Sequence, residues 1–222
     1  MKKYETNKLF YNEYLYKLSV ENRLASIFRN RNFSFARKVL DELQHNYNEG
    51  KPLLRQYYKR ADNISEQTFL EAKRLYSFLS KKEDFTLRIE VGSMNIYSND
   101  KDWLVDIATS INSENIISLH SPNPLYEHDI DKNTILLNHP FPYNYKVTFG
   151  NRKSNPGFVN FAKSNPHLIK IGPIASQVLE TDGYVQNMYF YARDEKTIQL
   201  CHLMLGNIRR IDKLVVKSNL DK

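Results

Sequence analysis

Two stretches of the chain, MNIYSNDKDWLVDI at residues 94–107 and MYFYARDEKTIQL at residues 188–200, align with each other without a gap. Each begins with alternating residues, as a β-strand does, and continues with apolar residues at helical spacing. The shared aspartate starts each expected helix, so it predicts an N-cap rather than a catalytic acid. The matched pairs are Met94 with Met188, Ile96 with Phe190, Tyr97 with Tyr191, Ser98 with Ala192 and Asp100 with Asp194.

A second match precedes the first in each half of the chain. Residues 14–20 read YLYKLSV and residues 143–149 read YNYKVTF, which aligns Lys17 with Lys146. Because two matches recur in the same order, we interpret the chain as an internal duplication. Apolar spacing predicts helices at 33–46, 64–80, from Pro156 onward and at 195–205, and strands at 85–91, 94–98, 114–120, 184–192 and 207–216.

The order of elements in each half is strand, helix, one or two strands, helix, strand. With the middle strand counted as a hairpin, this order is the ferredoxin-like βαββαβ plan. The expected fold class is α+β, with two ferredoxin-like repeats whose antiparallel sheets carry helices on one face. The alternative is one irregular α+β domain. The expected domains are residues 1–121 with an inserted loop and helix turn at 44–65, a connector at 122–142, and residues 143–222.

The composition is that of an ordinary globular chain: 222 residues, 41% of them hydrophobic and 26% charged, with a formal charge of +7. No apolar run approaches the roughly 20 residues that span a bilayer, so we expect no membrane partner and a cytoplasmic location. The composition is rich in Asn, Lys and Tyr and poor in Gly, which is typical of AT-rich genomes and suits a phage or other virus. For a viral protein, the expected location is the host cytoplasm or the virion. The single cysteine, Cys201, excludes an internal disulfide.

The basic charge and the tyrosines together favour a nucleic-acid partner. Alternation puts Tyr189, Tyr191 and Arg193 on the strand face opposite Met188 and Phe190. Rings beside cations on an open sheet bind single-stranded RNA or DNA by stacking and phosphate contact. The arrangement resembles RNA-recognition modules in topology and residue type, although neither half carries their aromatic and glycine-rich signature. The alternative is that these tyrosines are buried where two sheet faces pack together.

Further cations lie in FRNRN at residues 28–32, in KPLLRQYYKR at 51–60 and in IRRIDK at 208–213. Such solvated cations suit phosphate contacts, although most charge runs form only a solvated surface. The expected nucleic-acid-binding residues are Lys17, Arg29, Arg31, Arg55, Tyr97, Lys146, Tyr189, Tyr191, Arg193 and Arg209.

One cluster in the connector could suggest catalysis: His120, Glu127, His128, Asp129, Asp131 and His139. These are metal-ligand types, but their spacing matches no metal motif, so no metal and no cofactor are predicted. The chain also lacks a glycine-rich phosphate loop. The sequence thus predicts a non-enzymatic nucleic-acid-binding protein. The alternatives are an assembly or protein-interaction component, with a protein partner or a homo-oligomer, and a metal-dependent nuclease.

Overall fold

The computed structural model describes residues 1–57, 60–150, 155–181, 185 and 187–220. The chain forms two compact units. The first unit comprises Met1–Thr6 and Glu13–Asn123, and the second comprises Asn7–Asn12 and Pro124–Lys222. The sequence analysis placed residues 7–12 in the first domain and residues 122–142 in a separate connector. In the structure, Asn7–Asn12 and residues 124–142 belong to the second unit.

The first unit contains a five-stranded sheet of order β1-β7-β2-β6-β5, in which β1 runs parallel to β7 and the other neighbours are antiparallel. A separate hairpin, β3–β4, lies between its first two α-helices. Its elements are β1 Lys2–Glu5, β2 Tyr16–Glu21, η1 Ala25–Arg31, α1 Phe33–Asn48, β3 Leu54–Tyr57, β4 Arg60–Asn63, α2 Glu66–Leu79, β5 Thr86–Glu90, β6 Ser93–Ser98, α3 Lys101–Ser110, η2 Ser113–Asn115 and β7 Ile116–Ser121.

The second unit contains a five-stranded sheet of order β8-β12-β9-β11-β10, in which β8 runs parallel to β12 and the other neighbours are antiparallel. Its elements are η3 Glu127–Asp129, β8 Thr134–Leu137, β9 Tyr145–Phe149, α4 Pro156–Ser164, β10 Ile169–Ile171, α5 Pro173–Glu180, β11 Tyr189–Ala192, α6 Glu195–Leu205, β12 Ile208–Val216 and η4 Lys217–Asn219.

The two sheets have the same order of strands and the same relative strand directions. The strands in equivalent positions are β1 and β8, β7 and β12, β2 and β9, β6 and β11, and β5 and β10. The main connections differ at two points. Between β2 and β5 the first unit has η1, α1, the β3–β4 hairpin and α2, whereas α4 alone links β9 to β10. Strand β5 joins β6 through a tight turn at Gly92, whose φ of +72° suits glycine, whereas helix α5 intervenes between β10 and β11.

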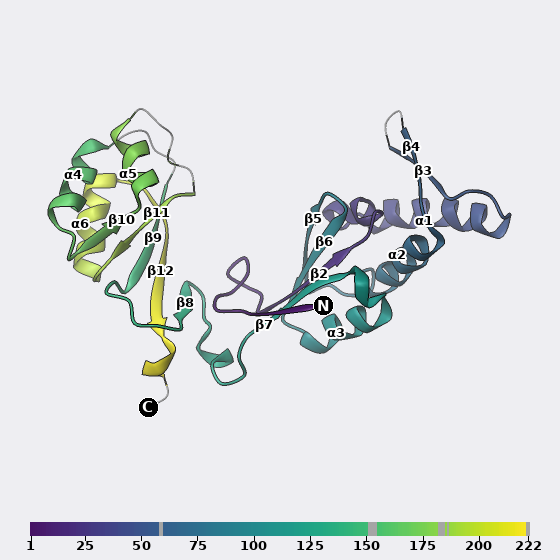
Figure 1. Ribbon diagram of the computed structural model, residues 1–222, viewed down its shortest axis with the longest axis horizontal. Helices are drawn as coiled ribbons and strands as arrows, with labels where there is room; N and C mark the ends of the chain where they lie inside the picture. The colour runs from purple at the N-terminus through teal and green to yellow at the C-terminus, as the bar shows by residue number, and fades with distance from the viewer. Residues whose placement is uncertain (58–59, 151–154, 182–184, 186, 221–222) are drawn as a thin grey trace. The chain divides into compact units, whose positions relative to one another are not determined.

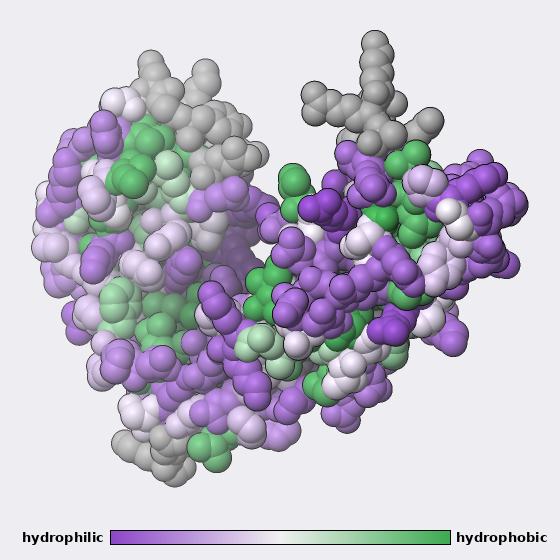
Figure 2. Space-filling view, turned by 45° about the vertical axis from the view of Figure 1, so that its right-hand side comes forward, coloured by the Kyte–Doolittle hydropathy of each residue, from purple (hydrophilic) through white to green (hydrophobic). Residues whose placement is uncertain are grey.

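In each unit the helices gather on one face of the sheet, and the core lies between the two layers (Figure 1). Leu18 and Ile96 are fully buried in the first core, and Val147 and Phe190 in the second. In the space-filling view, hydrophilic residues cover most of the visible surface and apolar residues form scattered patches (Figure 2).

Local signals set the helix ends much as expected. The side chain of Ser65 caps α2, that of Asn155 caps α4 ahead of Pro156, and Gly206 ends α6 in the left-handed conformation with a φ of +67°. The predicted helix at residues 195–205 is confirmed at both ends.

Several elements differ from the sequence-based expectation. The inserted segment at residues 44–65 completes α1 and then forms the β3–β4 hairpin rather than a loop and helix turn. Strands β1, β8 and β10 and helix α5 were not predicted. All four residues of β1 are exposed, so they lack the alternation of a half-buried strand. Within the described residues, no helix is both long and apolar enough to cross a bilayer.

Candidate nucleic-acid interface

The face of the second sheet that points away from the helices carries three of the predicted residues side by side. Lys146 of β9 pairs with Tyr191 of β11, and Thr148 pairs with Tyr189. The ammonium of Lys146 lies 3.8 Å from the centre of the Tyr189 ring, a cation–π contact. The rings of Tyr189 and Tyr191 meet edge to face at 5.4 Å, and Tyr189 is 41% exposed.

Two further aromatic rings extend this group. The Phe141 ring contacts Tyr191 edge to face at 4.8 Å, and Tyr143 stacks toward Tyr191 at 6.4 Å. The ammonium of Lys170 lies 5.5 Å from the Phe141 ring centre. We call this group the tyrosine face: Phe141, Tyr143, Lys146, Lys170, Tyr189 and Tyr191. Sequence reasoning missed Phe141 and Lys170, although the aromatic run FPYNY at residues 141–145 was a visible signal.

The charges around Lys146 are mainly positive. Burial lowers the pKa of Lys146, and the nearby cations Lys8 and Arg210 lower it further, while Tyr189 and Asp212 raise it. Arg210 is bound to Asp212, with its Nε 2.5 Å from Oδ1. Burial and the hydrogen bond with Tyr189 raise the pKa of Tyr191, so its hydroxyl stays protonated and able to donate. This surface can therefore attract an anion beside exposed rings.

A pocket of 440 Å³ opens beside the tyrosine face. Lys146, Tyr191 and Phe141 contribute to its wall, together with β8, the segment after it and Asn7. All of these residues belong to the second unit.

The equivalent face of the first unit has the same pairing but less exposure. Lys17 of β2 lies opposite Tyr97 of β6 on one side and opposite His120 of β7 on the other. Tyr97 is only 6% exposed, and the ring of Tyr4 stacks on His120 at 4.9 Å. Burial, followed by the charge of Lys17, lowers the pKa of His120, so the neutral imidazole is favoured. Of the two faces, that of the second unit is better suited to stacking with a ligand.

The structure brings together two of the predicted arginines that the sequence separates. Arg29 and Arg55 line one pocket of 810 Å³ between η1, α1 and β3. Arg31, by contrast, packs within the unit: its guanidinium lies 4.3 Å from the Phe85 ring centre and donates to the carbonyls of Phe85 and Lys82. Arg31 is thus engaged in the fold, while Arg29 and Arg55 line one pocket together with the acidic Glu42.

The remaining two predicted residues lie at the margin of the second sheet. Arg193 is exposed just beyond β11, and its backbone N–H donates to Leu168. Arg209 donates to the Asn187 side chain at 2.8 Å. A register shift in β12 places Arg210, rather than Arg209, opposite Thr148, beside Lys146. The sequence could not reveal this shift, since a bulge moves a residue to the other face of the sheet.

The cluster considered for metal binding is spread over several elements. His120 lies in β7, while Glu127, His128 and Asp129 form η3, and Asp131 and His139 lie on either side of β8. Across the residues that the structure describes, no three His, Cys, Asp or Glu side chains are grouped so that they could hold a metal ion.

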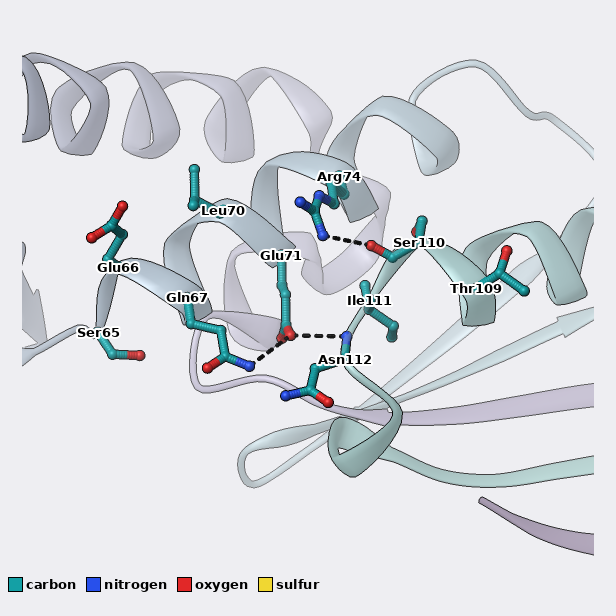
Figure 3. A pocket seen from close by; sticks show the side chains of 10 residues that line it. All are labelled: Ser65, Glu66, Gln67, Leu70, Glu71, Arg74, Thr109, Ser110, Ile111 and Asn112. Carbon is teal, nitrogen blue, oxygen red and sulfur yellow. Dashed lines mark hydrogen bonds between the residues drawn. The ribbon is translucent and has the colours of Figure 1, made fainter.

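Two carboxylates in the first unit serve the fold. Glu71 of α2 lies in the wall of a 620 Å³ pocket, where it accepts hydrogen bonds from the Asn112 backbone N–H at 3.1 Å and from Gln67 (Figure 3). It also accepts from the Asn115 side chain at 2.7 Å. These bonds tie α2 to the segment that leads into β7.

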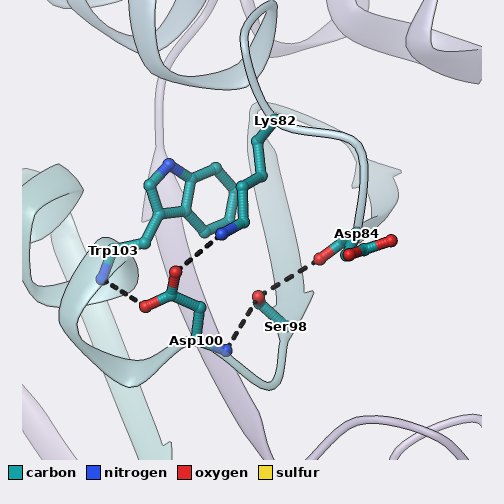
Figure 4. Close-up of polar contacts among 5 residues, drawn as sticks. All are labelled: Lys82, Asp84, Ser98, Asp100 and Trp103. Carbon is teal, nitrogen blue, oxygen red and sulfur yellow. Dashed lines mark hydrogen bonds and ion pairs between the residues drawn. The ribbon is translucent and has the colours of Figure 1, made fainter.

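Asp100 performs the predicted capping role. One of its oxygens accepts from the Trp103 N–H at 2.9 Å, and the other binds the Lys82 ammonium at 2.6 Å (Figure 4). The Lys82 hydrogen bond, followed by that of Trp103, holds the pKa of Asp100 below its usual value. Asp194 likewise caps α6 by accepting from the Thr197 N–H at 2.8 Å. Both shared aspartates are thus N-caps, as the sequence predicts.

Comparison of the chain with protein-family models, with curated proteins and with solved structures finds no match.

Proposed function

We propose that this protein is a non-enzymatic nucleic-acid-binding protein that holds single-stranded RNA or DNA on the tyrosine face of its second unit. The observation that carries the proposal is the contact between the Lys146 ammonium and the exposed Tyr189 ring. A base can stack on such a ring while the neighbouring ammonium meets a phosphate. Stacking on a tyrosine ring tolerates any base, because every base has a π-face. Since only an unpaired base can present that face to the ring, this surface favours single strands over duplexes.

We also propose that the two units are ferredoxin-like repeats that arose by duplication. The equal strand orders support this, and so does the register. The residues that align in the sequence, Lys17 with Lys146 and Tyr97 with Tyr191, occupy equivalent cross-strand pairs in the two sheets. The second unit has the βαββαβ order once α5 and the outer strand β8 are left out, and the first unit has it once β1 and the extra hairpin and helix between β2 and β5 are left out.

The pocket at Arg29 and Arg55, which Glu42 also lines, is a second candidate for phosphate contact. Arginine guanidinium groups can neutralise phosphates without reading the bases. In this proposal the second unit supplies stacking and the first unit supplies additional charge.

The test is the binding of a fluorescent oligonucleotide, followed by anisotropy at low salt, with single-stranded RNA, single-stranded DNA and a duplex of the same length. We expect the single strands to bind more tightly than the duplex, and Lys146→Ala to weaken the binding. Lys196→Ala, which removes an exposed cation from α6 on the helical side of the same unit, is the matched control and should leave affinity unchanged.

Absence of binding at low salt would rule the proposal out. If the protein then behaved as a stable oligomer in solution, the assembly role would replace nucleic-acid binding.

A further inference from the structure

Tyr191 lies at the centre of a cross-strand row that has a lysine on each side. Lys170 of β10 and Lys146 of β9 both pair with Tyr191 of β11, so the three side chains share one face of the sheet. Because neighbouring strands are about 4.8 Å apart, the backbones of the two lysines are separated by about 10 Å. The tyrosine face therefore carries two distinct positive charges, one on either side of an aromatic ring.

Each of these lysines has a ring of its own. The Lys146 ammonium lies 3.8 Å from the centre of the Tyr189 ring, and the Lys170 ammonium lies 5.5 Å from the centre of the Phe141 ring. The rings of Tyr189 and Phe141 both contact the Tyr191 ring edge to face, at 5.4 Å and 4.8 Å. The combination of a cation and a ring thus occurs twice on one continuous aromatic surface.

A buried tyrosine supports the two rings at the Lys170 end of this surface. Tyr143 is buried, and its hydroxyl donates to the Pro166 carbonyl at 2.6 Å. Its ring lies 5.5 Å from that of Phe141 and 6.4 Å from that of Tyr191. Because Tyr143 is fixed by its own hydrogen bond, the partly exposed rings that pack on it are largely pre-ordered. Pre-ordered side chains lose less conformational entropy when a ligand binds.

The lysine on β10 is peculiar to the second unit. In the equivalent row of the first unit, Thr86 takes the place of Lys170, beside Tyr97 and Lys17. The Thr86 hydroxyl donates to the Tyr14 hydroxyl at 3.2 Å. Since the first sheet forms with a threonine at this position, the strand arrangement does not require a lysine there. A ligand-binding role accounts for its presence on the exposed face.

We propose that the tyrosine face binds two successive unstacked nucleotides of a single strand at two adjoining positions. At the first position, a base stacks on Tyr189 and a phosphate lies at Lys146. At the second position, the neighbouring base stacks on Phe141 and its phosphate lies at Lys170. Splayed bases stack in this way on aromatic side chains, and a lysine ammonium neutralises a phosphate as a point charge. The inference rests on the proposed function and adds to it a second position and a minimum ligand of two adjacent nucleotides.

The experiment uses fluorescent DNA octamers in which abasic sites replace all thymines except one or two, with the full chain at fixed salt and neutral pH. Length and charge are then the same in every probe. We expect two adjacent thymines to bind about tenfold more tightly than one, because a second base stacks on a ring. Two thymines at opposite ends of the octamer should lose most of this gain, because the spacing between them no longer matches the two positions.

Variants of the second position test its two components separately. Phe141→Ala should reduce the gain from the second thymine to less than about twofold, whereas Phe141→Tyr, which keeps a ring, should preserve it. Lys170→Ala should lower the slope of log affinity against log salt by about 0.7, the value for one phosphate contact on a single strand. Lys196→Ala, at an exposed site on α6, is the matched control and should leave the slope unchanged.

The outcomes separate the two proposals. If the probe with one thymine binds and Lys146→Ala weakens it, but a second thymine adds nothing, the second position is wrong and nucleic-acid binding stands. A gain that survives Phe141→Ala also overturns the second position. If Phe141→Ala disturbs the fold, Lys170→Ala decides, and an unchanged salt slope refutes the phosphate contact. If none of the probes binds, both proposals fall.

Discussion

Lys146 of β9 lies directly opposite Tyr191 of β11 in the sheet of the second unit. Lys17 and Tyr97 form the same pair in the sheet of the first unit. The pairs differ in what surrounds them: Tyr97 is 6% exposed, whereas Tyr189, beside the second pair, is 41% exposed. One repeated sequence pattern thus yields a closed face in one unit and an accessible aromatic surface in the other.

Stacking and charge on the tyrosine face can be separated by salt. Tyr189→Ala should weaken oligonucleotide binding by about 1–3 kcal/mol without changing the salt dependence, because a stacking partner is lost. Lys146→Ala should instead reduce the slope of log affinity against log salt by about 0.7, the value for one phosphate contact on a single strand. Titrations at several salt concentrations measure both quantities.

Leu203→Ala is the control for Tyr189→Ala, since Leu203 is 84% exposed on α6 and belongs to the helical side. Equal effects of the two substitutions, or a Tyr189→Ala variant that alters only the slope, would contradict the stacking role.

Glu71 should contribute strongly to the stability of the first unit. The residue is 3% exposed, and its carboxylate accepts from Asn112, Asn115 and Gln67. Glu71→Ala leaves these partly buried donors without their acceptor, so we expect a loss of about 1–2 kcal/mol in the free energy of unfolding. Urea denaturation measures this. Asp106→Ala, at an exposed site on α3, should cost far less, and a similar loss in both variants would refute the assignment.

Asp100 should make stability depend on pH in the acid range. The pKa of Asp100 is lowered in the folded protein, chiefly by the Lys82 hydrogen bond, so the unfolded chain takes up its proton first. The stabilisation is therefore present above the unfolded pKa and is lost as the pH falls through the folded pKa. At neutral pH, Asp100→Asn should be less stable than the unsubstituted protein by up to about 1 kcal/mol, since the pair with Lys82 is partly exposed to solvent.

Urea denaturation of both proteins at pH 7 and near pH 3 tests this expectation, because the difference between them should shrink in acid. A difference that stays constant, or that grows, would show that Asp100 acts without its charge.

Cys201 should be inert in the folded protein. Its thiol lies in the second core with no exposed surface, and burial raises its pKa to about 12. A thiol-reactive dye at pH 8 should therefore label the native protein at least about 100-fold more slowly than the urea-unfolded chain, because the thiolate is the reacting form. Since the chain has one cysteine, the labelling rate reports opening of the second unit. Rapid labelling of the native protein would contradict the burial.

Much of the secondary structure could be predicted because it depends on local chemistry. The helices α1, α2, α3 and α6 follow from apolar spacing and from the caps at Ser65, Asp100 and Asp194. The strands with alternating burial, such as β11, follow from the same kind of pattern. Strands β1 and β8 could not be predicted, since each is defined by its parallel partner, β7 or β12, far away in the sequence.

The sequence by itself determined the two matched strand-and-helix stretches, the aspartates that cap the helices, and the placement of Lys146, Tyr189 and Tyr191 on one face of the second sheet. These depend on neighbours within a few residues, through alternation and through side-chain bonds to nearby backbone. Only the tertiary structure decided that Tyr97 is buried and Tyr189 exposed, that Arg31 packs on Phe85, and that Asn7 and Phe141 join Lys146 around one pocket. The exposure of a side chain, the register of a strand and the walls of a pocket depend on segments that come into contact only when the chain folds. A local sequence pattern does not show which distant segments will be in contact.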